Sequence, residues 1–244
     1  MSRWRILTVA IAFLAIAGYL IAPRPVRQTL GQFSTDPILI LDAGHGGEDG
    51  GATSADGTKE SEINLQLVLR LEALCALCGR KTYLIRRDDR SVYSPDCTTV
   101  SEKKRSDLRN RVEMVNSLPG TFLLSIHQNK FPQGKYRGAQ VFYGEVGNSK
   151  ELAEQVQSSL REAVDPRNRR KCKPAEGIYL FQNIRNPGIL VECGFLSNPG
   201  EAELLRKPDY QKKLAAAILA PILRAGRNTN DEIETGLLLQ GVRQ

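Results

Sequence analysis

Short apolar runs alternate along this chain with segments of helical length, and this alternation constrains the fold more than any other feature. Each apolar run reads as a buried strand, and the segments between them carry helix periodicity or helix-ending signals. We expect strands at residues 38–41, 82–85, 122–126, 140–143 and 189–192, and helices at 64–78, 101–117, 149–163, 199–206 and 209–224. The alternation predicts an α/β three-layer sandwich, in which helices flank a mostly parallel sheet.

The N-terminus carries an apolar leader, residues 1–22, with the composition of a membrane-spanning segment. Residues 6–22 carry no charge and follow Arg3 and Arg5. They would form a helix of about 25 Å, slightly shorter than a bilayer core of about 30 Å. We therefore predict a membrane anchor, with a signal peptide cleaved near Ala15-Ile16-Ala17 as the alternative. Either leader places the remaining chain outside the cytoplasmic membrane, anchored to it or secreted.

The rest of the 244-residue chain divides into a linker, one domain and a tail. Residues 23–36 form a linker rich in proline and arginine. Residues 37–226 have the length of one domain with a single core, and Gly226 is expected to end the last helix. Residues 227–244 form a mostly polar tail. The net charge is +7, but acidic residues interleave with the basic ones, so we expect no nucleic-acid partner.

The five cysteines do not form a recognisable metal or redox motif. Cys75 and Cys78 have CxxC spacing, but they lie inside an expected apolar helix and no second CxxC follows. We interpret both as small core residues. Whether Cys97 and Cys172 form a disulfide stays open.

The chain has only two histidines, and each lies where an apolar run ends. His45 follows the strand at 38–41, and His127 follows the strand at 122–126. The carboxyl ends of parallel strands meet at one edge of a sheet, where ligands bind in open α/β folds. A catalytic zinc commonly takes two histidines and one glutamate. The two histidines therefore predict a zinc site at this edge.

Carboxylates for the same site come from two places in the chain. Glu192 closes the apolar strand at 189–192, and a buried acid there is costly unless it is paired or functional. The loop at 47–62 offers the third zinc ligand. Glu60 and Glu62 stand at the start of a helix, where the helix dipole favours a carboxylate for any role. The residues alone leave the choice between Glu60 and Glu62 open.

Other enzyme motifs fail on inspection. A dinucleotide-binding GxGxxG loop would need glycine where Asp49 stands, and the chain has no GxxxxGK[ST] phosphate loop and no GxSxG nucleophile elbow. A nucleophilic dyad of Cys193 and His127 is the remaining alternative. It would leave His45 and its glycine-rich loop without a role.

Four segments together resemble the zinc-dependent N-acetylmuramoyl-L-alanine amidases of type 3, which hydrolyse bacterial cell wall. They are LDAGHGG at 41–47, ESEINL at 60–65, SIHQN at 125–129 and VECGFLSN at 191–198. The resemblance spans about residues 37–226, in the family's order. It implies a zinc ion on His45, Glu60 and His127 and a catalytic glutamate at Glu192, which resolves the choice in favour of Glu60. Ser61 replaces the family's usual lysine.

Within that family the chain is most similar to the germination-specific branch, on the grounds of a short single-domain build, an N-terminal hydrophobic segment and close matches at 184–192 and 198–205. This implies peptidoglycan of the spore cortex as substrate, a role in muramic-δ-lactam formation and an activating lipoprotein partner. Asp42 is a candidate for orienting a ligand, and Asn129 and Arg109 are candidates for contacting substrate. The alternatives are a zinc peptidase acting on stem peptides and a non-catalytic, membrane-anchored wall-binding protein.

Overall fold

The structure is a computed structural model that describes residues 37–241, with side chains described for residues 37–225. The predicted leader at 1–22 and linker at 23–36 lie outside these residues. Within the described part of the chain, no helix is both long and apolar enough to cross a membrane. The elements in chain order are β1 (Leu39–Ala43), α2 (Glu60–Leu77), β2 (Thr82–Leu84), α3 (Val100–Asn116), β3 (Phe122–Asn129), β4 (Gln140–Tyr143), α4 (Ser149–Ala163), β5 (Lys173–Pro174), α5 (Tyr179–Asn183), β6 (Gly188–Phe195), α6 (Pro199–Leu205) and α7 (Pro208–Gly241).

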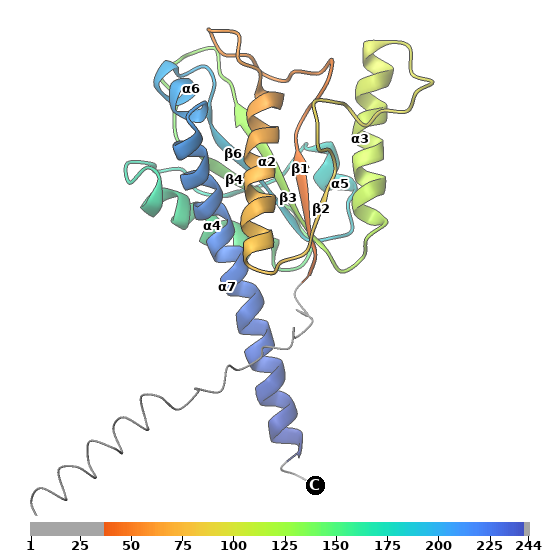
Figure 1. Cartoon of the computed structure of the whole chain (residues 1–244), viewed down its shortest axis with the longest axis vertical. Helices are drawn as coiled ribbons and strands as arrows, with labels where there is room; N and C mark the ends of the chain where they lie inside the picture. The colour runs from red at the N-terminus through yellow and green to blue at the C-terminus, as the bar shows by residue number, and fades with distance from the viewer. Residues whose placement is uncertain (1–36, 242–244) are drawn as a thin grey trace, which may run out of the picture. The chain divides into compact units, whose positions relative to one another are not determined.

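The six strands form one sheet in the order β2-β1-β3-β6-β4-β5 (Figure 1). Parallel pairs join β1 to β2, β1 to β3, β3 to β6 and β4 to β5, and only β4 and β6 pair antiparallel. The prediction of a mostly parallel sheet is confirmed. Strands β1, β3 and β6 are apolar runs because helices cover both of their faces.

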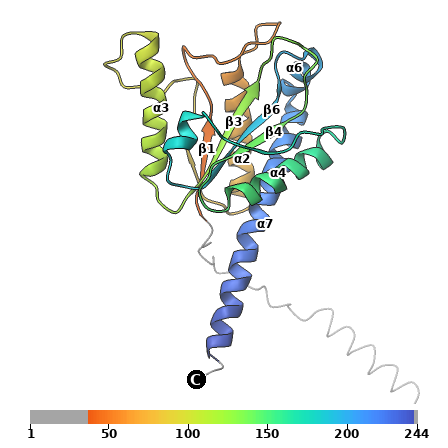
Figure 2. The same ribbon diagram turned by 180° about the vertical axis from the view of Figure 1, so that it is seen from behind.

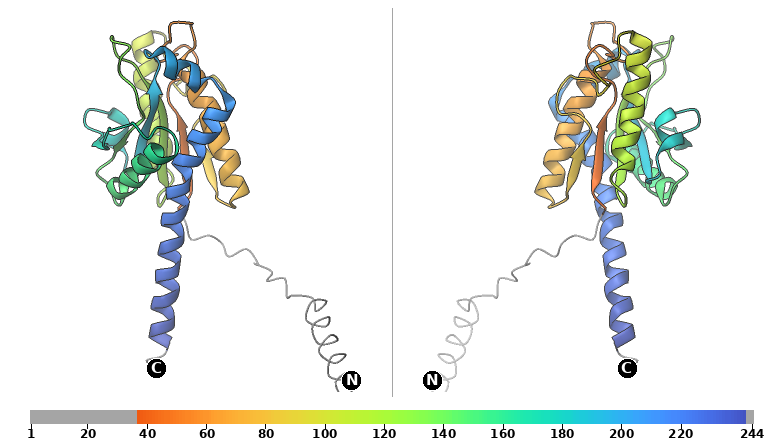
Figure 3. Two further views of the ribbon diagram at one scale, coloured as in Figure 1. Left: turned by 90° about the vertical axis from the view of Figure 1, so that its left-hand side faces the viewer. Right: turned by 90° about the vertical axis from the view of Figure 1, so that its right-hand side faces the viewer.

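Helices cover the two faces of this sheet. Helices α2, α4 and α7 pack on one face, and α3 and α5 lie over the other (Figures 1 and 2). Strand β1 shows why both layers form: Leu39 and Leu41 join the first core, and Ile40 joins the second. Alternate strand residues point to opposite faces, so one apolar run serves both cores. Views from the two sides show the sheet between its helical layers (Figure 3).

Three of the predicted element ends that differ from the structure bear on the site. β3 continues to Asn129 and β6 to Phe195, so His127 and Glu192 lie within strands and are paired in register. Backbone pairing between the two strands continues past the apolar residues, with an irregularity after His127. Helix α2 begins at Glu60, four positions before the expected start. Its polar first turn was not recognised as helical because the apolar periodicity begins only at Ile63.

The C-terminal helix α7 runs through Gly226 to Gly241, so the prediction that Gly226 ends it is wrong. A glycine inside a helix costs only about 1 kcal/mol relative to alanine, which the surrounding helix can absorb. The predicted polar tail at 227–244 is therefore helical as far as Gly241.

All five cysteines lie in the described part of the chain and are free thiols, and Cys97 and Cys172 form no disulfide. Cys75 is fully buried in the core beneath α2, as expected. Cys78 is exposed because it is the residue that ends this helix, so the prediction that it is a core residue is wrong.

Candidate metal and catalytic site

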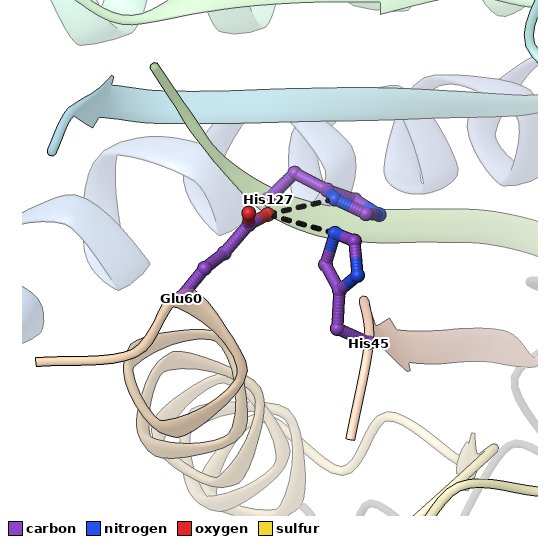
Figure 4. A group of neighbouring side chains, drawn as sticks. All are labelled: His45, Glu60 and His127. Atoms are coloured by element: carbon purple, nitrogen blue, oxygen red, sulfur yellow. Dashed lines mark hydrogen bonds and ion pairs between the residues drawn. The ribbon is translucent and has the colours of Figure 1, made fainter. Parts of the chain in front are cut away.

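Three elements bring His45, Glu60 and His127 together at the carboxyl edge of the sheet (Figure 4). His45 lies in the turn after β1, Glu60 is the first residue of α2, and His127 lies near the end of β3. One ligand atom from each residue lies within 4.8 Å of the other two. Glu60 Oε1 is 3.0 Å from His127 Nδ1 and 3.4 Å from His45 Nε2. Two imidazoles and one carboxylate at these separations could hold a metal ion.

Glu60 is held rigidly at the centre of this cluster. Its Oε2 accepts a hydrogen bond from the backbone of Ala52 at 2.9 Å, and its Oε1 accepts one from the backbone of Gln128 at 3.0 Å. Burial opposes ionisation, but the contacts with His127 and His45 outweigh it and hold the pKa of Glu60 well below its usual range. Glu62, the alternative ligand, is exposed on the outer side of the same helical turn.

His45 has an unusual backbone conformation. Its φ of 61° is the only positive value at a non-glycine residue in the described part of the chain. This left-handed conformation costs about 1–2 kcal/mol in an L-residue, so the surrounding contacts must hold it. The ring is held as well, because Nδ1 lies 3.0 Å from Asp49 Oδ2. That contact leaves Nε2 facing Glu60, the arrangement in which a carboxylate orients a metal-binding histidine.

The ring contact with Asp49 also sets the charge of the metal-free site. Burial disfavours a charged imidazole, but the hydrogen bonds to Asp49 and Glu60 outweigh it and raise the pKa of His45 to about 9. The same hydrogen bond lowers the pKa of Asp49 to about 2. A cation at this position, whether a proton or a metal ion, is therefore favoured by the two carboxylates.

Glu192 lies beside the cluster with one oxygen unpaired. It is opposite His127 in the β3–β6 pairing, and its Oε2 is buried without a hydrogen-bond partner. Burial raises the pKa of Glu192 to about 7. A buried carboxylate oxygen without a partner is costly to folding, so its presence needs an explanation such as a chemical role.

The weaker sequence candidates lie elsewhere or have other contacts. Arg109 is exposed on α3, and Asn129 is half-buried at the end of β3. Asp42 does not touch the three-residue cluster: it forms a buried ion pair with Arg111 and accepts a hydrogen bond from Ser125 Oγ at 2.6 Å. Cys193 is fully buried and burial raises the pKa of its thiol, so it is not a nucleophile in a dyad with His127.

Two buried arginines near the site, Arg86 and Arg111, were not identified from the sequence. They are 4% and 3% exposed. A signal for Arg111 was present, because Leu108, Arg111 and Val115 share the helical spacing that faces a core. The sequence analysis did not use this spacing, and Arg111 lies on the inner side of α3.

A mostly parallel α/β sheet that brings two histidines and two glutamates together at its carboxyl edge is an arrangement typical of hydrolases with a metal site. Residues 39–224 match the N-acetylmuramoyl-L-alanine amidase family. The chain belongs to that family, and its enzyme class is that of an N-acetylmuramoyl-L-alanine amidase.

Individual relatives agree with this assignment. A germination-specific N-acetylmuramoyl-L-alanine amidase of Bacillus subtilis is 39% identical over 188 residues, which cover 77% of this chain and 78% of that protein. The CwlD amidase from Clostridioides difficile, solved in complex with the GerS lipoprotein, is 42% identical, with a TM-score of 0.74 over 78% of this chain and 98% of that one. An N-acetylmuramoyl-L-alanine amidase from Clostridium difficile is 28% identical, with a TM-score of 0.65 over 78% and 97%.

Proposed function

We propose that this protein is a zinc-dependent amidase that cleaves the bond between N-acetylmuramic acid and L-alanine in the peptidoglycan of the spore cortex. The observation that carries the proposal is the convergence of His45, Glu60 and His127 beside the unpaired Oε2 of Glu192. Two imidazoles and one carboxylate are a common protein ligand set for catalytic zinc, and that set leaves a coordination position open.

The donor set fits zinc better than calcium or magnesium. Calcium and magnesium prefer a shell of oxygen ligands, whereas two of these three ligands are imidazoles. Zinc bound there would act as a Lewis acid, polarising the scissile carbonyl and lowering the pKa of a water molecule.

The protein's own contribution to the chemistry is proton transfer by Glu192. Its Oε2 takes the proton of the attacking water and then gives it to the nitrogen of L-alanine as the amide bond breaks. Charge balances, because the carboxylate ends as it began and the amine leaves neutral. The backbone amides that bind Glu60, from Ala52 and Gln128, keep the central ligand fixed while this transfer occurs.

The cortex substrate and the partner are supported by the relatives. One relative is described as germination-specific, and another was solved with a lipoprotein. We infer that this chain acts outside the cytoplasmic membrane, that it contributes to muramic-δ-lactam formation and that a lipoprotein activates it. The apolar leader at 1–22 fits an anchor to the cytoplasmic or forespore membrane, or a signal peptide that releases the protein.

Product analysis tests this function. The full-length chain is incubated with cortex-type peptidoglycan and zinc, with and without a chelator, and the products are identified by mass spectrometry. We expect peptide-free muramic acid together with stem peptides that carry a free L-alanine amine, both lost on chelation. Cleavage inside the stem peptide would indicate a zinc peptidase. Full zinc occupancy without hydrolysis, even with a lipoprotein partner, would indicate a wall-binding protein.

The role of Glu192 is tested separately by Glu192→Gln. The amide keeps the shape of the side chain but cannot accept the proton, so we expect kcat to fall by about 10²–10⁴-fold. Zinc content should stay at the wild-type level, because Glu192 is not among the three clustered ligands. Near-normal turnover in this variant would show that another group moves the proton.

A further inference from the structure

Two buried arginines hold the backbone around the metal cluster without belonging to it. Arg86 follows β2 and Arg111 lies on the inner side of α3, and both side chains are almost fully buried. Buried guanidinium groups are costly unless their donors are satisfied. Their partners include the backbone of β1 and its turn, and the start of α2.

Arg111 binds the backbone at His45 and two residues before it. Its Nη1 donates to the carbonyl of Ala43 at 3.1 Å, and its Nη2 donates to the carbonyl of His45 itself at 2.8 Å. Ion pairs with Asp42 and Asp107 fix the guanidinium in this position. Arg111 thus holds the left-handed backbone of His45 through a hydrogen bond to its carbonyl.

Arg86 links the backbone beside His45 to the backbone beside Glu60. Its Nε donates to the carbonyl of Ala43 at 2.8 Å, and its Nη1 donates to that of Asp88 at 2.8 Å. Its Nη2 donates both to Gly44 at 3.1 Å and to Ser61 at 2.8 Å. Gly44 precedes His45 and Ser61 follows Glu60, so one nitrogen ties together the residues adjacent to two of the clustered side chains.

We propose that Arg86 and Arg111 are positioning residues that set His45 and Glu60 at metal-binding separation before the metal arrives. This inference rests on the proposed role of His45 and Glu60 as ligands. A guanidinium suits the task because its donors form a rigid planar fork that can meet carbonyls on two elements at once. A lysine would keep the charge but could not reproduce that geometry.

The test compares Arg86→Lys with Arg80→Lys in the full-length chain. Arg80 is a matched control: it is 7% exposed, and it lies just beyond the far end of α2, whose 18 residues span about 27 Å. Zinc affinity is measured by competition with a chromophoric chelator, and the visible spectrum is recorded after cobalt replaces zinc. Thermal unfolding in excess chelator reports the stability of each metal-free fold.

We expect Arg86→Lys to weaken zinc binding by about 10–100-fold, the range for residues that orient metal ligands, and to change the cobalt spectrum. Arg80→Lys should bind zinc as the wild type does, even if both variants lower the unfolding temperature equally. Arg111→Lys should also weaken zinc binding. It tests the positioning role if Arg86→Lys does not fold.

The outcomes separate this inference from the proposed function. Wild-type zinc affinity and an unchanged cobalt spectrum in folded Arg86→Lys or Arg111→Lys would overturn the positioning role. A His45→Ala variant that keeps wild-type zinc affinity would instead overturn the proposed ligand set. Equal weakening of zinc binding in Arg80→Lys would show a general loss of stability, and the positioning role would also fail.

Discussion

At the scale of single residues, Gly44 leaves no room for a side chain beside His127. A Cβ atom on Gly44 would lie 2.2 Å from the imidazole of His127, a distance at which the ring must move. Gly44→Ala should therefore displace a ligand and weaken zinc binding by at least about tenfold. Affinity is measured by chelator competition. Gly200→Ala is the control, because its Cβ would meet nothing closer than 3.5 Å. Equal zinc affinity in the two variants would show that His127 is not a ligand.

The buried pair of Asp42 and Arg111 makes stability depend on pH. Burial opposes ionisation of Asp42, but Arg111, the nearby His127 and the hydrogen bond from Ser125 together outweigh it and lower the pKa of Asp42 in the folded state. Its contribution is therefore complete above the unfolded pKa of about 3.9 and is lost as the pH falls through the lowered value.

We expect Asp42→Asn to lower the free energy of unfolding by about 3–5 kcal/mol at neutral pH, because it leaves a buried guanidinium without this partner. The gap between variant and wild type should narrow as the pH falls below about 4. Denaturant titrations across this range measure both. A gap that stays constant down to the lowest pH would show that Asp42 is not ionised in the folded protein.

At the scale of elements, Asn64 joins the three segments that carry the clustered side chains. From α2, its Nδ2 donates to the carbonyl of Gly44 at 3.1 Å, and its Oδ1 accepts from Gln128 Nε2 at 3.1 Å. Asn64→Ala would leave buried polar groups of both neighbours unpaired. We expect it to cost about 1–3 kcal/mol of unfolding free energy in chelator, and to weaken zinc binding as well.

Asn116→Ala provides the comparison for that prediction. Asn116 also links distant segments, since its side chain donates to Asn183 and accepts from Arg185, but it lies at the other end of the sheet. This variant should lose stability and keep its zinc affinity. If both variants change zinc affinity alike, the link through Asn64 has no special part in the site.

The elements also show what the sequence could and could not predict. Apolar runs located the strands because burial on both faces leaves a composition signal. The end of β3 was placed too early because polar residues such as His127 are held in the sheet by backbone pairing, which composition does not report. The end of β6 was placed at Glu192, although the strand continues to Phe195. The first turn of α2 was missed because its carboxylate faces the site rather than the core.

At the scale of the whole molecule, the cluster brings together segments that are far apart in the sequence. Residues 45, 60 and 127 come from segments far apart in sequence, and a metal that binds all three stabilises the folded state alone. Zinc at one hundred times its Kd should add about 2.7 kcal/mol to the free energy of unfolding. Unfolding temperatures with zinc and with chelator measure this. If zinc gives no increase, the metal does not bind the folded cluster.

At the same scale, the sequence predicted the fold and the edge of the sheet that carries the cluster, but it missed the buried arginines and the end of α7. The two histidines at strand ends indicated the edge of the sheet where the cluster lies, but Glu60 was chosen over Glu62 only through the resemblance to the amidase family. The family match covers the expected domain almost end to end. The buried arginines were missed because charged side chains are normally exposed, whether they lie in a helix, as Arg111 does, or after a strand, as Arg86 does. The continuation of α7 past Gly226 was missed because a glycine after the last apolar residue usually marks a helix end.

We expect His45, Glu60 and His127 to bind zinc. Crystals of the zinc-loaded protein, measured on both sides of the zinc absorption edge, test it most directly. We expect one anomalous peak among these three side chains, with zinc–nitrogen distances of about 2.0–2.1 Å and a carboxylate oxygen of Glu60 at about 2.0–2.2 Å. A peak at thiols, for example at Cys75 and Cys78 with zinc–sulfur distances of about 2.3 Å, and none at the cluster would contradict it.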